Sequence, residues 1–415
     1  MVISYQISPV FSVCLLLDIA LLVKANVKQH KAFVHCQFSR LREHPNLSRN
    51  EVMSAIYIGS EIYRKSSFGY NHPLSYARQE SVADMCRALG WLDVDNFIQS
   101  PIANITTLTR YHDHAYVSAL KSCGASGSVP KNIREYYNFG TMENPLFTGI
   151  FDRAATTVGG SIEAAKQALK GHIAFHPSGG THHGLKDKAH GFCYFNDPAF
   201  AILTLLDAGL ERIAYVDIDA HHGDGVELAF LNDERVLTAS IHEDNRWPYS
   251  GTLLDQGKAR LNIPVPIGIN DSEFKMLFDR VILSKIEKFQ AQAIVVTCGT
   301  DALDHDPLSK MALSSNALWE AVLSLKRINL PLVVLGGGGY NPWTTIRTWV
   351  GLWGLLSNQT LPDSLPPAAR DILNSFDSDL IDEEDRLADW TTTLMDKPNQ
   401  GPIRDEIKAL VERLA

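Results

Sequence analysis

Seven short apolar runs, separated by helical patterns, restrict the possible folds of this chain more than any other feature. They cover residues 54–59, 172–175, 212–219, 236–242, 259–266, 293–299 and 330–339. Several are apolar on both faces, which is typical of parallel strands that are covered by helices on both sides. Helical patterns span residues 151–171, 271–292 and 316–328. This alternation predicts an α/β fold with an open, mostly parallel sheet flanked by helices on both faces.

The ends of two of these helices can be predicted from local residues. Gly171 is a plausible stop for the first helix, and the Asp271–Ser272 pair suits an N-cap for the second.

The chain divides most simply into three parts. Its 415 residues are 45% hydrophobic, enough for a large core. We assign 54–360 to one α/β domain and 361–415 to an acidic C-terminal tail with a terminal helix. Residues 1–53 form an N-terminal extension, read as an extra helix or as sequence upstream of a later start such as Met53. Its apolar run at 9–23 is short for a membrane span, which needs about 20 residues.

Charge and cysteine content exclude several classes of protein. The net charge of −9 and the absence of any Lys/Arg-rich run argue against a nucleic-acid partner. The six cysteines form no C-x-x-C pair, which argues against a cysteine-based structural zinc site and favours a reducing compartment. We therefore expect a cytoplasmic protein, with no membrane partner apart from the uncertain N-terminal segment.

The segment "AYVDIDAHHGDGVE" carries the densest group of ionisable residues. Asp217, Asp219 and His221 alternate along the end of an apolar run, so they share one side of an extended segment. Carboxylates and an imidazole that converge in this way predict a divalent metal site with nitrogen and oxygen ligands. A solvated surface turn is the alternative, but it does not explain why the group follows a buried strand.

Three further polar segments also follow apolar runs. His182 and His183 come after a Gly-Gly pair, and two adjacent histidines suggest general acid/base chemistry. Asp301 could supply a second metal carboxylate, with Asp304 and Asp306 as alternatives, although a lone Asp at a strand end is more often a cap or turn residue.

The glycine run that precedes Tyr340 has two interpretations. Residues 336–339 could cradle a phosphate, but the Lys-Ser/Thr of a P-loop is absent. Alternatively, the glycines make room for Tyr340, whose phenol would act as a hydrogen-bond donor. In open α/β sheets ligands bind beyond the carboxyl ends of the strands, so we expect all four segments to meet at one site.

Taken together, the segments resemble the histone deacetylase family, including the bacterial acetoin-utilisation-type deacetylases. The match is carried by "GGTHHGLKDKAHGFCYFND", "YVDIDAHHGDGVE", "CGTDALDHDP" and "LGGGGYN", in that order, with weaker matches at 111–120 and 143–155. The resemblance covers about residues 55–357 and implies an arginase/deacetylase-like fold.

The resemblance also implies roles for individual residues. It implies a single Zn²⁺ held by Asp219, His221 and Asp301, although two carboxylates and one histidine also suit Fe²⁺. It implies that His182 and His183 are catalytic and are oriented by Asp217 and Asp224, respectively. Tyr340 would bind the carbonyl oxygen of the substrate.

Further positions match the substrate channel and structural ions of the family. Phe192, with Gly191 beside it, and Trp247 would form the walls of a narrow acyl-lysine tunnel, and Arg78 would lie near an internal cavity. A structural K⁺ or Na⁺ would be bound by residues Asp217, Asp219, His221, Ser240 and Ile241.

Three departures from the family pattern stand out. Trp247 replaces the more usual Phe, and Ser75–Tyr76 replaces a Lys-Pro pair before Arg78. A rim aspartate that grips the substrate backbone in some relatives has no clear counterpart in residues 124–140.

The expected function is a zinc-dependent deacetylase that hydrolyses the acetyl amide of acetyl-lysine, with His183 as general base and His182 as its electrostatic partner. The partner would then be an acetylated protein or peptide. Deacetylation of acetylpolyamines or other small acetylated amines is an alternative, and a protein that binds acyl ligands without hydrolysis is another. A binuclear manganese hydrolase needs more metal-facing acids and histidines than the sequence offers.

Overall fold

The computed structural model describes residues 53–64, 68–69 and 72–415. The extension assigned to 1–53 therefore lies outside the described residues, apart from Met53. The described chain forms an eight-stranded sheet with the order β2-β1-β3-β8-β7-β4-β5-β6, and every neighbouring pair is parallel. The strands are β1 (Ala55–Gly59), β2 (Phe97–Gln99), β3 (Ile173–His176), β4 (Ile213–Asp217), β5 (Val236–Glu243), β6 (Arg260–Val265), β7 (Ala293–Thr297) and β8 (Leu332–Leu335).

All seven expected strands are present, and one further strand was missed. β2 is a three-residue strand on the edge of the sheet, and none of its residues is buried. A segment so short and so exposed carries no apolar run, so its sequence resembles a loop. The seven others have mostly buried residues, and the predicted α/β fold with an open parallel sheet is confirmed.

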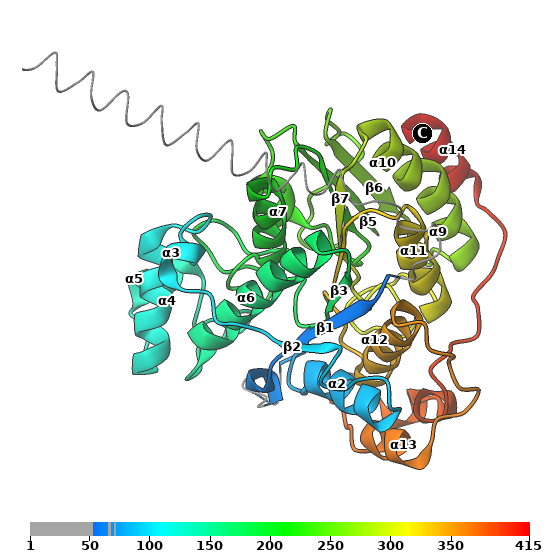
Figure 1. The fold of residues 1–415 in the computed structure, drawn as a ribbon, viewed down its shortest axis with the longest axis horizontal. Helices are drawn as coiled ribbons and strands as arrows, with labels where there is room; N and C mark the ends of the chain where they lie inside the picture. The colour runs from blue at the N-terminus through cyan, green and yellow to red at the C-terminus, as the bar shows by residue number, and fades with distance from the viewer. Residues whose placement is uncertain (1–52, 65–67, 70–71) are drawn as a thin grey trace, which may run out of the picture. The chain divides into compact units, whose positions relative to one another are not determined.

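Helices cover both faces of the sheet (Figure 1). α6 and α7 pack on one face, against β3, β4, β7 and β8, while α2, α11 and α12 lie on the other. The helices are α2 (Arg78–Ala88), α3 (Ile105–Leu108), α4 (His114–Ser126), α5 (Lys131–Tyr137), α6 (Ile150–Leu169), α7 (Asp197–Asp207), α8 (Asp224–Ala229), α9 (Asp271–Leu277), α10 (Leu283–Phe289), α11 (Ser315–Arg327), α12 (Pro342–Leu356), α13 (Pro367–Asn374) and α14 (Asp405–Leu414).

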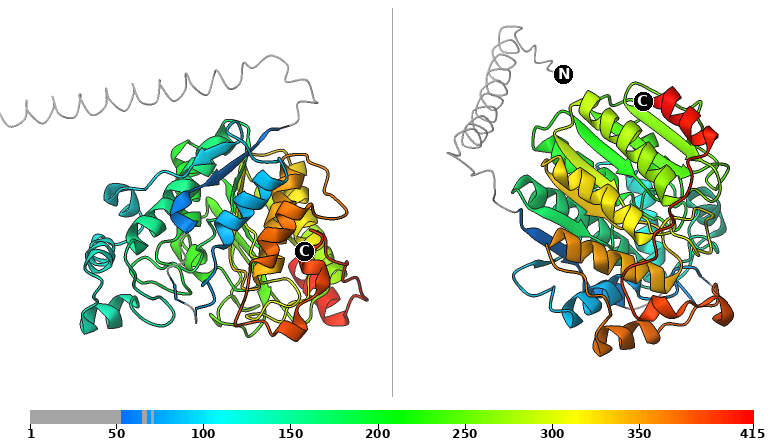
Figure 2. Two further views of the ribbon diagram at one scale, coloured as in Figure 1. Left: turned by 90° about the horizontal axis from the view of Figure 1, so that it is seen from below. Right: turned by 90° about the vertical axis from the view of Figure 1, so that its right-hand side faces the viewer.

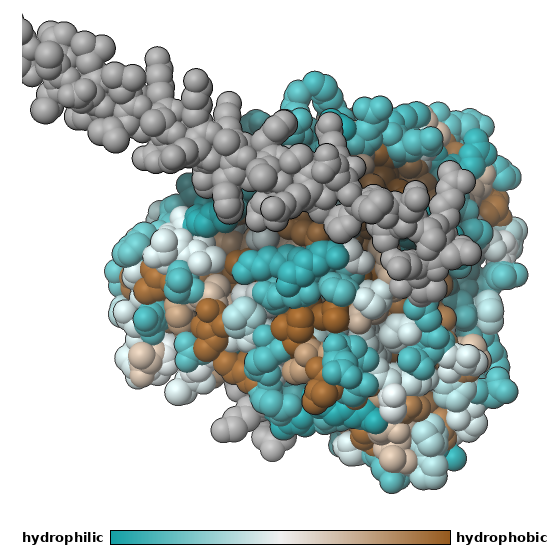
Figure 3. Space-filling model, viewed as in Figure 1, coloured by the Kyte–Doolittle hydropathy of each residue, from teal (hydrophilic) through white to brown (hydrophobic). Residues whose placement is uncertain are grey.

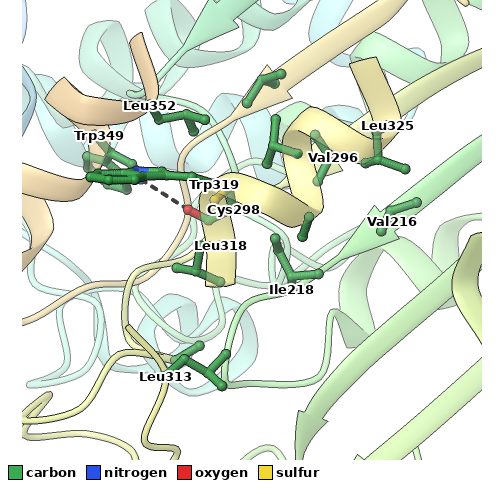
Figure 4. Close-up of a cluster of buried hydrophobic side chains, with 14 of the residues drawn as sticks. Val216, Ile218, Val296, Cys298, Leu313, Leu318, Trp319, Leu325, Trp349 and Leu352 are labelled. Carbon is green, nitrogen blue, oxygen red and sulfur yellow. Dashed lines mark hydrogen bonds between the residues drawn. The ribbon is translucent and has the colours of Figure 1, made fainter. Parts of the chain in front are cut away.

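Alternation along the strands divides the core between the two faces. In β7, Val296 belongs to the cluster beneath α11 and α12, whereas Val295 belongs to the cluster beneath α6 and α7. Figure 4 shows part of the first cluster, where the indole of Trp349 donates a 3.0 Å hydrogen bond to the carbonyl of Cys298. This bond ties α12 to the turn that follows β7, close to the polar segments.

The helical pattern at 271–292 is interrupted in the structure. α9 and α10 are separated by a π-helical turn, η2 (Phe278–Ile282). The N-cap is Asn270 and not the expected Asp271–Ser272 pair, because the Asn270 side chain and Glu273 form a reciprocal capping box. Asp271 is instead buried and accepts hydrogen bonds from Ser314.

The segment expected to be an acidic tail also contributes to the core. Trp390, Leu394 and Ile407 belong to the same buried cluster as the sheet. The indole of Trp390 stacks on that of Trp343 in α12, with ring centroids 5.7 Å apart. Figure 2 shows the terminal helix α14 beside the other helices on this face, and α14 contacts α9. Short 3₁₀ turns lie at η1 (Glu61–Arg64), η3 (Glu383–Asp385) and η4 (Ala388–Thr391).

Helices α3 to α5 form a small group on the outer side of α6, with their own core around Tyr116, Phe139 and Phe195 (Figure 1). In the view of Figure 3, hydrophobic residues lie in separate small groups between hydrophilic ones. Among the described helices, none combines the length and apolar character that crossing a membrane requires.

Replacing Gly159 with alanine is expected to destabilise the fold. A Cβ on Gly159 in α6 would lie 1.9 Å from the Pro101 carbonyl oxygen, so the backbone must shift. Overpacking of this kind costs about 1–3 kcal/mol, more than the helix propensity that Ala adds. The change is measured as the midpoint of urea unfolding. Gly124→Ala is the control, since its nearest contact is the end of the Ile150 side chain at 3.2 Å. Equal midpoints for the two variants would contradict this account.

Candidate metal centre and catalytic site

The four polar segments meet because they follow four neighbouring strands. β3, β8, β7 and β4 are adjacent in the sheet and parallel, so their carboxyl ends share one edge. His182 and His183 follow β3, Asp219 follows β4, Asp301 follows β7, and Tyr340 follows β8. The order of the strands thus explains why segments more than a hundred residues apart form one site.

Asp219, His221 and Asp301 form a buried cluster whose ligand atoms all lie within 4.8 Å of one another. His221 Nδ1 is 2.9 Å from Asp301 Oδ2 and 3.3 Å from Asp219 Oδ1. Backbone amides orient both carboxylates: the N–H of Gly338 donates to Asp219 Oδ2 at 2.6 Å, and that of Ala220 donates to Asp301 Oδ1 at 3.0 Å. These are the three residues that the sequence resemblance implies as metal ligands.

Glycines allow the main chain to enclose the two carboxylates. A Cβ on Gly299 would lie 1.9 Å from Asp219 Oδ2, and one on Gly338 would lie 1.9 Å from Asp301 Oδ2. Of the two interpretations of the glycine run, the geometry therefore supports close approach. The backbone of residues 336–339 packs against carboxylates, which would repel a phosphate.

The electrostatics of this cluster fit a bound cation. Burial, followed by the charge of Asp219, raises the pKa of Asp301. Two buried carboxylates and one imidazole are a donor set that suits Zn²⁺ or Fe²⁺, and a divalent cation would offset the repulsion between the acids. Three protein ligands also leave positions free for water and substrate.

Each of the two adjacent histidines is paired with its own buried aspartate. His182 Nδ1 lies 2.7 Å from Asp217 Oδ2, and His183 Nδ1 lies 2.7 Å from Asp224 Oδ1. These are the pairs that the resemblance implies. Such a pair fixes the orientation and tautomer of the ring, which leaves the other ring nitrogen for chemistry.

The two histidines differ in their affinity for a proton. Burial would lower the pKa of His182, but the charges of Asp217 and Asp219 outweigh burial and raise it to about 9. Burial and the neighbouring His182 lower the pKa of His183 to about 3. His183 is therefore neutral, and the ring nitrogen that does not face Asp224 carries a lone pair. A cation in the Asp219 cluster would lower the pKa of both histidines, because it disfavours the protonated imidazoles.

His190 is a further histidine at this site that the sequence did not single out. Its Nδ1 lies 3.2 Å from Asp224 Oδ2, so Asp224 is shared between His190 and His183. The ring of His190 also packs against Trp247, with centroids 4.6 Å apart. Together with His183 and Asp224 it forms a second cluster of possible metal ligands. The sequence offers one indication that His190 belongs to the site, namely its position within the matched segment "KAHGFC".

The sequence offered Asp306 as an alternative metal ligand. In the structure its carboxylate contacts the Tyr340 loop and is not part of the metal cluster. Its Oδ2 accepts a 2.8 Å hydrogen bond from the backbone N–H of Tyr340, and its Oδ1 accepts one of 2.9 Å from Leu308. The other alternative, Asp304, is exposed. Burial and the charges of Asp301 and Asp219 raise the pKa of Tyr340, so its phenol is protonated and can donate.

The carbonyl group of Gly339, which precedes Tyr340, is held by two further side chains. The Gly339 oxygen accepts hydrogen bonds of 2.9 Å from both Tyr76 Oη and Arg78 Nη1. Tyr76 is one of the two residues that depart from the family pattern before Arg78. The departure therefore supplies a hydroxyl that helps to fix the Tyr340 loop.

Phe192 and Trp247, both half-buried, line a pocket at this site. The pocket is also lined by Glu143, His183, Gly191, His221, Arg246, Leu308 and Tyr340. A Cβ on Gly191 would lie 2.3 Å from the Trp247 ring, so a glycine is required for Trp247 to pack here. The phenol ring of Tyr340 lies 5.9 Å from that of Phe192.

A second cavity adjoins the first and shares His183, Gly191, Phe192 and Tyr340 with it. Arg78, which the resemblance implies near an internal cavity, lines this second cavity.

Glu143, which lies outside residues 124–140, is a further acidic residue that lines this pocket. Its Oε1 accepts a 2.6 Å hydrogen bond from the Gly191 backbone, and its Oε2 accepts one from Asn138. It begins the weakly matching segment "ENPLFTGIFDRAA".

His222 is not in the metal cluster and contacts Ser250 and Glu227.

A divalent cation should bind to Asp219, His221 and Asp301 and not to the second cluster. Asp301→Asn is expected to weaken Zn²⁺ binding by more than about 100-fold, since loss of a mere outer-shell partner already costs about 10–100-fold. Calorimetric titration of metal-free protein measures the affinity. His190→Ala, in the second cluster, should leave it nearly unchanged. The reverse ranking of the two variants would contradict this assignment.

Comparison with known proteins agrees with this geometry. Residues 72–356 match the family model of the histone deacetylase domain. The chain is 34% identical over 309 residues to putative histone deacetylase 2 of Caenorhabditis elegans, covering 72% of this chain and 61% of that protein. It is 36% identical over 308 residues to histone deacetylase 1 of Oryza sativa subsp. japonica, covering 72% and 59%. The match thus spans about six tenths of the length of these curated relatives.

Solved structures extend the comparison to the fold. An HDAC homolog from Aquifex aeolicus superposes with a TM-score of 0.82 at 34% identity, covering 87% of this chain and 99% of that one. An HDAC homolog complexed with SAHA gives 0.83 at 35% identity, with the same coverage. The chain therefore belongs to the histone deacetylase family.

Proposed function

We propose that this protein is a zinc-dependent deacetylase that hydrolyses the acetyl amide of acetyl-lysine. One observation carries the proposal: His183 and Tyr340 line a single aromatic-walled pocket together with the ligand His221. Burial lowers the pKa of His183 and raises that of Tyr340, which favours a neutral imidazole and a protonated phenol. Membership of the histone deacetylase family supports deacetylation in general.

Asp219, His221 and Asp301 would hold the Zn²⁺, and Fe²⁺ suits the same donors. When bound, such a cation polarises the acetyl carbonyl and makes a water molecule more acidic. Two anionic ligands damp this effect relative to a site with three histidines, so the protein must assist with proton transfer.

His183 supplies the general base. Its neutral imidazole can accept the proton of the attacking water, and Asp224 then stabilises the resulting cation. His182, whose higher pKa is maintained by Asp217, acts as the electrostatic partner. The imidazolium formed at His183 can return its proton to the departing lysine amine, which balances the hydrolysis.

Tyr340 and the walls of the pocket act on the substrate itself. The Tyr340 hydroxyl donates a hydrogen bond to the carbonyl oxygen as negative charge develops there. Phe192 and Trp247 would pack against the methylene chain of lysine, which positions the amide and excludes bulk water.

Deacetylation of an acetylated polyamine is the second candidate function. Glu143 favours it, because a carboxylate at the pocket mouth would attract a cationic chain. Arg246 at the same mouth opposes it. Comparing turnover of acetyl-lysine peptides with that of N-acetylputrescine distinguishes the two functions.

Tyr340→Phe and His183→Ala should each lower kcat for an acetyl-lysine peptide by at least about 100-fold, because each removes a group that acts in the transition state. Acetate release by metal-loaded protein is the measurement, and metal content and thermal unfolding serve as controls. Near-normal turnover in both variants would overturn the mechanism. Peptide binding without acetate release by the unmodified protein would instead indicate an acyl-ligand binding protein.

Asp306→Asn should lower kcat by about 10- to 100-fold with little change in KM. Asn retains only one good acceptor, so the backbone of Tyr340 or Leu308 loses its partner and the hydroxyl of Tyr340 is displaced. The displacement matters only while that hydroxyl is present. The residual rate of Tyr340→Phe should therefore fall no further when Asp306→Asn is added. An additive loss would show that Asp306 acts elsewhere.

A further inference from the structure

Arg246 lies at the mouth of the tunnel but takes no part in the chemistry proposed above. It precedes the wall residue Trp247, and it lines the same pocket as Glu143 and Leu308. Its side chain is 29% exposed, so it is accessible at the rim without being fully solvated. A substrate whose acetyl-lysine enters this tunnel must pass its neighbouring groups close to Arg246.

The guanidinium of Arg246 is held in place by a buried acid. Arg246 Nη2 donates to Glu243 Oε1 at 2.6 Å, and the Glu243 side chain is only 2% exposed. The other oxygen of Glu243 accepts a 2.6 Å hydrogen bond from the Lys310 backbone. Glu243 therefore fixes Arg246 relative to the loop that carries Leu308. Much of the entropy lost in orienting a long side chain is thus already lost before a ligand arrives.

Glu243 accepts a hydrogen bond from only one of the guanidinium nitrogens of Arg246. Among the described residues, Arg246 Nη1 has no hydrogen-bond partner, whereas the unpaired Nε is buried and out of reach of a ligand. Arginine has five N–H donors in a planar fork that matches the geometry of a carboxylate. The free donors of Arg246 are therefore suited to a second carboxylate, supplied by a ligand at the pocket mouth.

Glu143 makes the same mouth asymmetric in charge. Both of its oxygens already accept hydrogen bonds, from Gly191 and Asn138, so its position is fixed as well. The entrance consequently presents a fixed anion and a fixed cation around one opening. A substrate with a carboxylate on the Arg246 side matches this arrangement, whereas a uniformly cationic chain does not.

We propose that Arg246 is a specificity-determining residue that binds a carboxylate close to the acetyl-lysine of the substrate. This inference rests on the proposed deacetylase function and names the class of substrate within it. The carboxylate can belong to an adjacent Asp or Glu side chain or to the C-terminus of acetyl-lysine itself. Both sources present the same chemistry to the guanidinium.

The test compares kcat/KM for four matched peptides at low ionic strength. In the first three, acetyl-lysine is followed by Glu, Gln or Lys with an amidated end, and in the fourth acetyl-lysine has a free C-terminal carboxylate. The unmodified protein should prefer at least one carboxylate peptide over the Gln peptide by about three- to tenfold, as expected for a partly exposed but preorganised ion pair. The peptide that shows the preference identifies the source. The preference should shrink in 0.5 M salt.

Arg246→Gln should abolish this preference by lowering kcat/KM for the carboxylate peptide to the value for the Gln peptide. Arg260→Gln is the matched control: Arg260 is 28% exposed and pairs with the largely buried Glu227, but it lies outside this pocket. The control should keep the preference of the unmodified protein.

Two outcomes would overturn the inference. In one, Arg246→Gln slows all four peptides equally and the preference for carboxylate persists, which would make Arg246 only a structural partner of Glu243. In the other, the unmodified protein hydrolyses the Gln peptide efficiently but shows no preference for a carboxylate. Failure of the deacetylase proposal is distinguishable from both, because then none of the four peptides would release acetate.

Discussion

The site depends on two carboxylates, Asp219 and Asp301, that are buried side by side at the end of a parallel sheet. Burying like charges is unfavourable unless a cation or hydrogen bonds compensate. The protein supplies part of the compensation through backbone amides, and the glycines at 299 and 338 let the main chain come close enough to do so. The surrounding features, from the paired histidines to the Tyr340 loop, are arranged around this charge.

The same constraint connects the groups of the proposed mechanism to one another. His182 gains proton affinity from Asp217 and also from the cluster residue Asp219, and the resulting charge helps to keep His183 neutral. Asp306 and Gly339 fix the loop that carries Tyr340. Each catalytic side chain therefore takes its protonation state or position from a neighbour that contacts no substrate in the proposed mechanism.

The sequence alone predicted the sheet and the residues that meet at its edge, because buried parallel strands leave long apolar runs and their ends collect polar groups. It did not predict β2, which is too short and too exposed to leave such a run. It placed the N-cap of α9 at Asp271–Ser272, whereas the cap is Asn270. Asp and Ser are also good capping residues, and only the contact with Glu273 distinguishes Asn270 from them. Glu143, His190 and Arg246 were missed because their roles depend on partners that lie far away in the sequence or across the pocket.

The packing of residues 361–415 has a consequence for how this protein can be divided. Trp390 stacks on Trp343, and Trp343 lies in the first turn of α12, three residues after Tyr340. The Arg386 guanidinium also lies over the Trp343 ring, 4.5 Å from its centroid. The acidic segment thus packs on the helix that begins just after the Tyr340 loop, and it contacts Tyr76 and His305 through Phe376 and Trp390. A fragment that ends at residue 360 would lose all of these contacts, so the Tyr340 loop would lose part of its support.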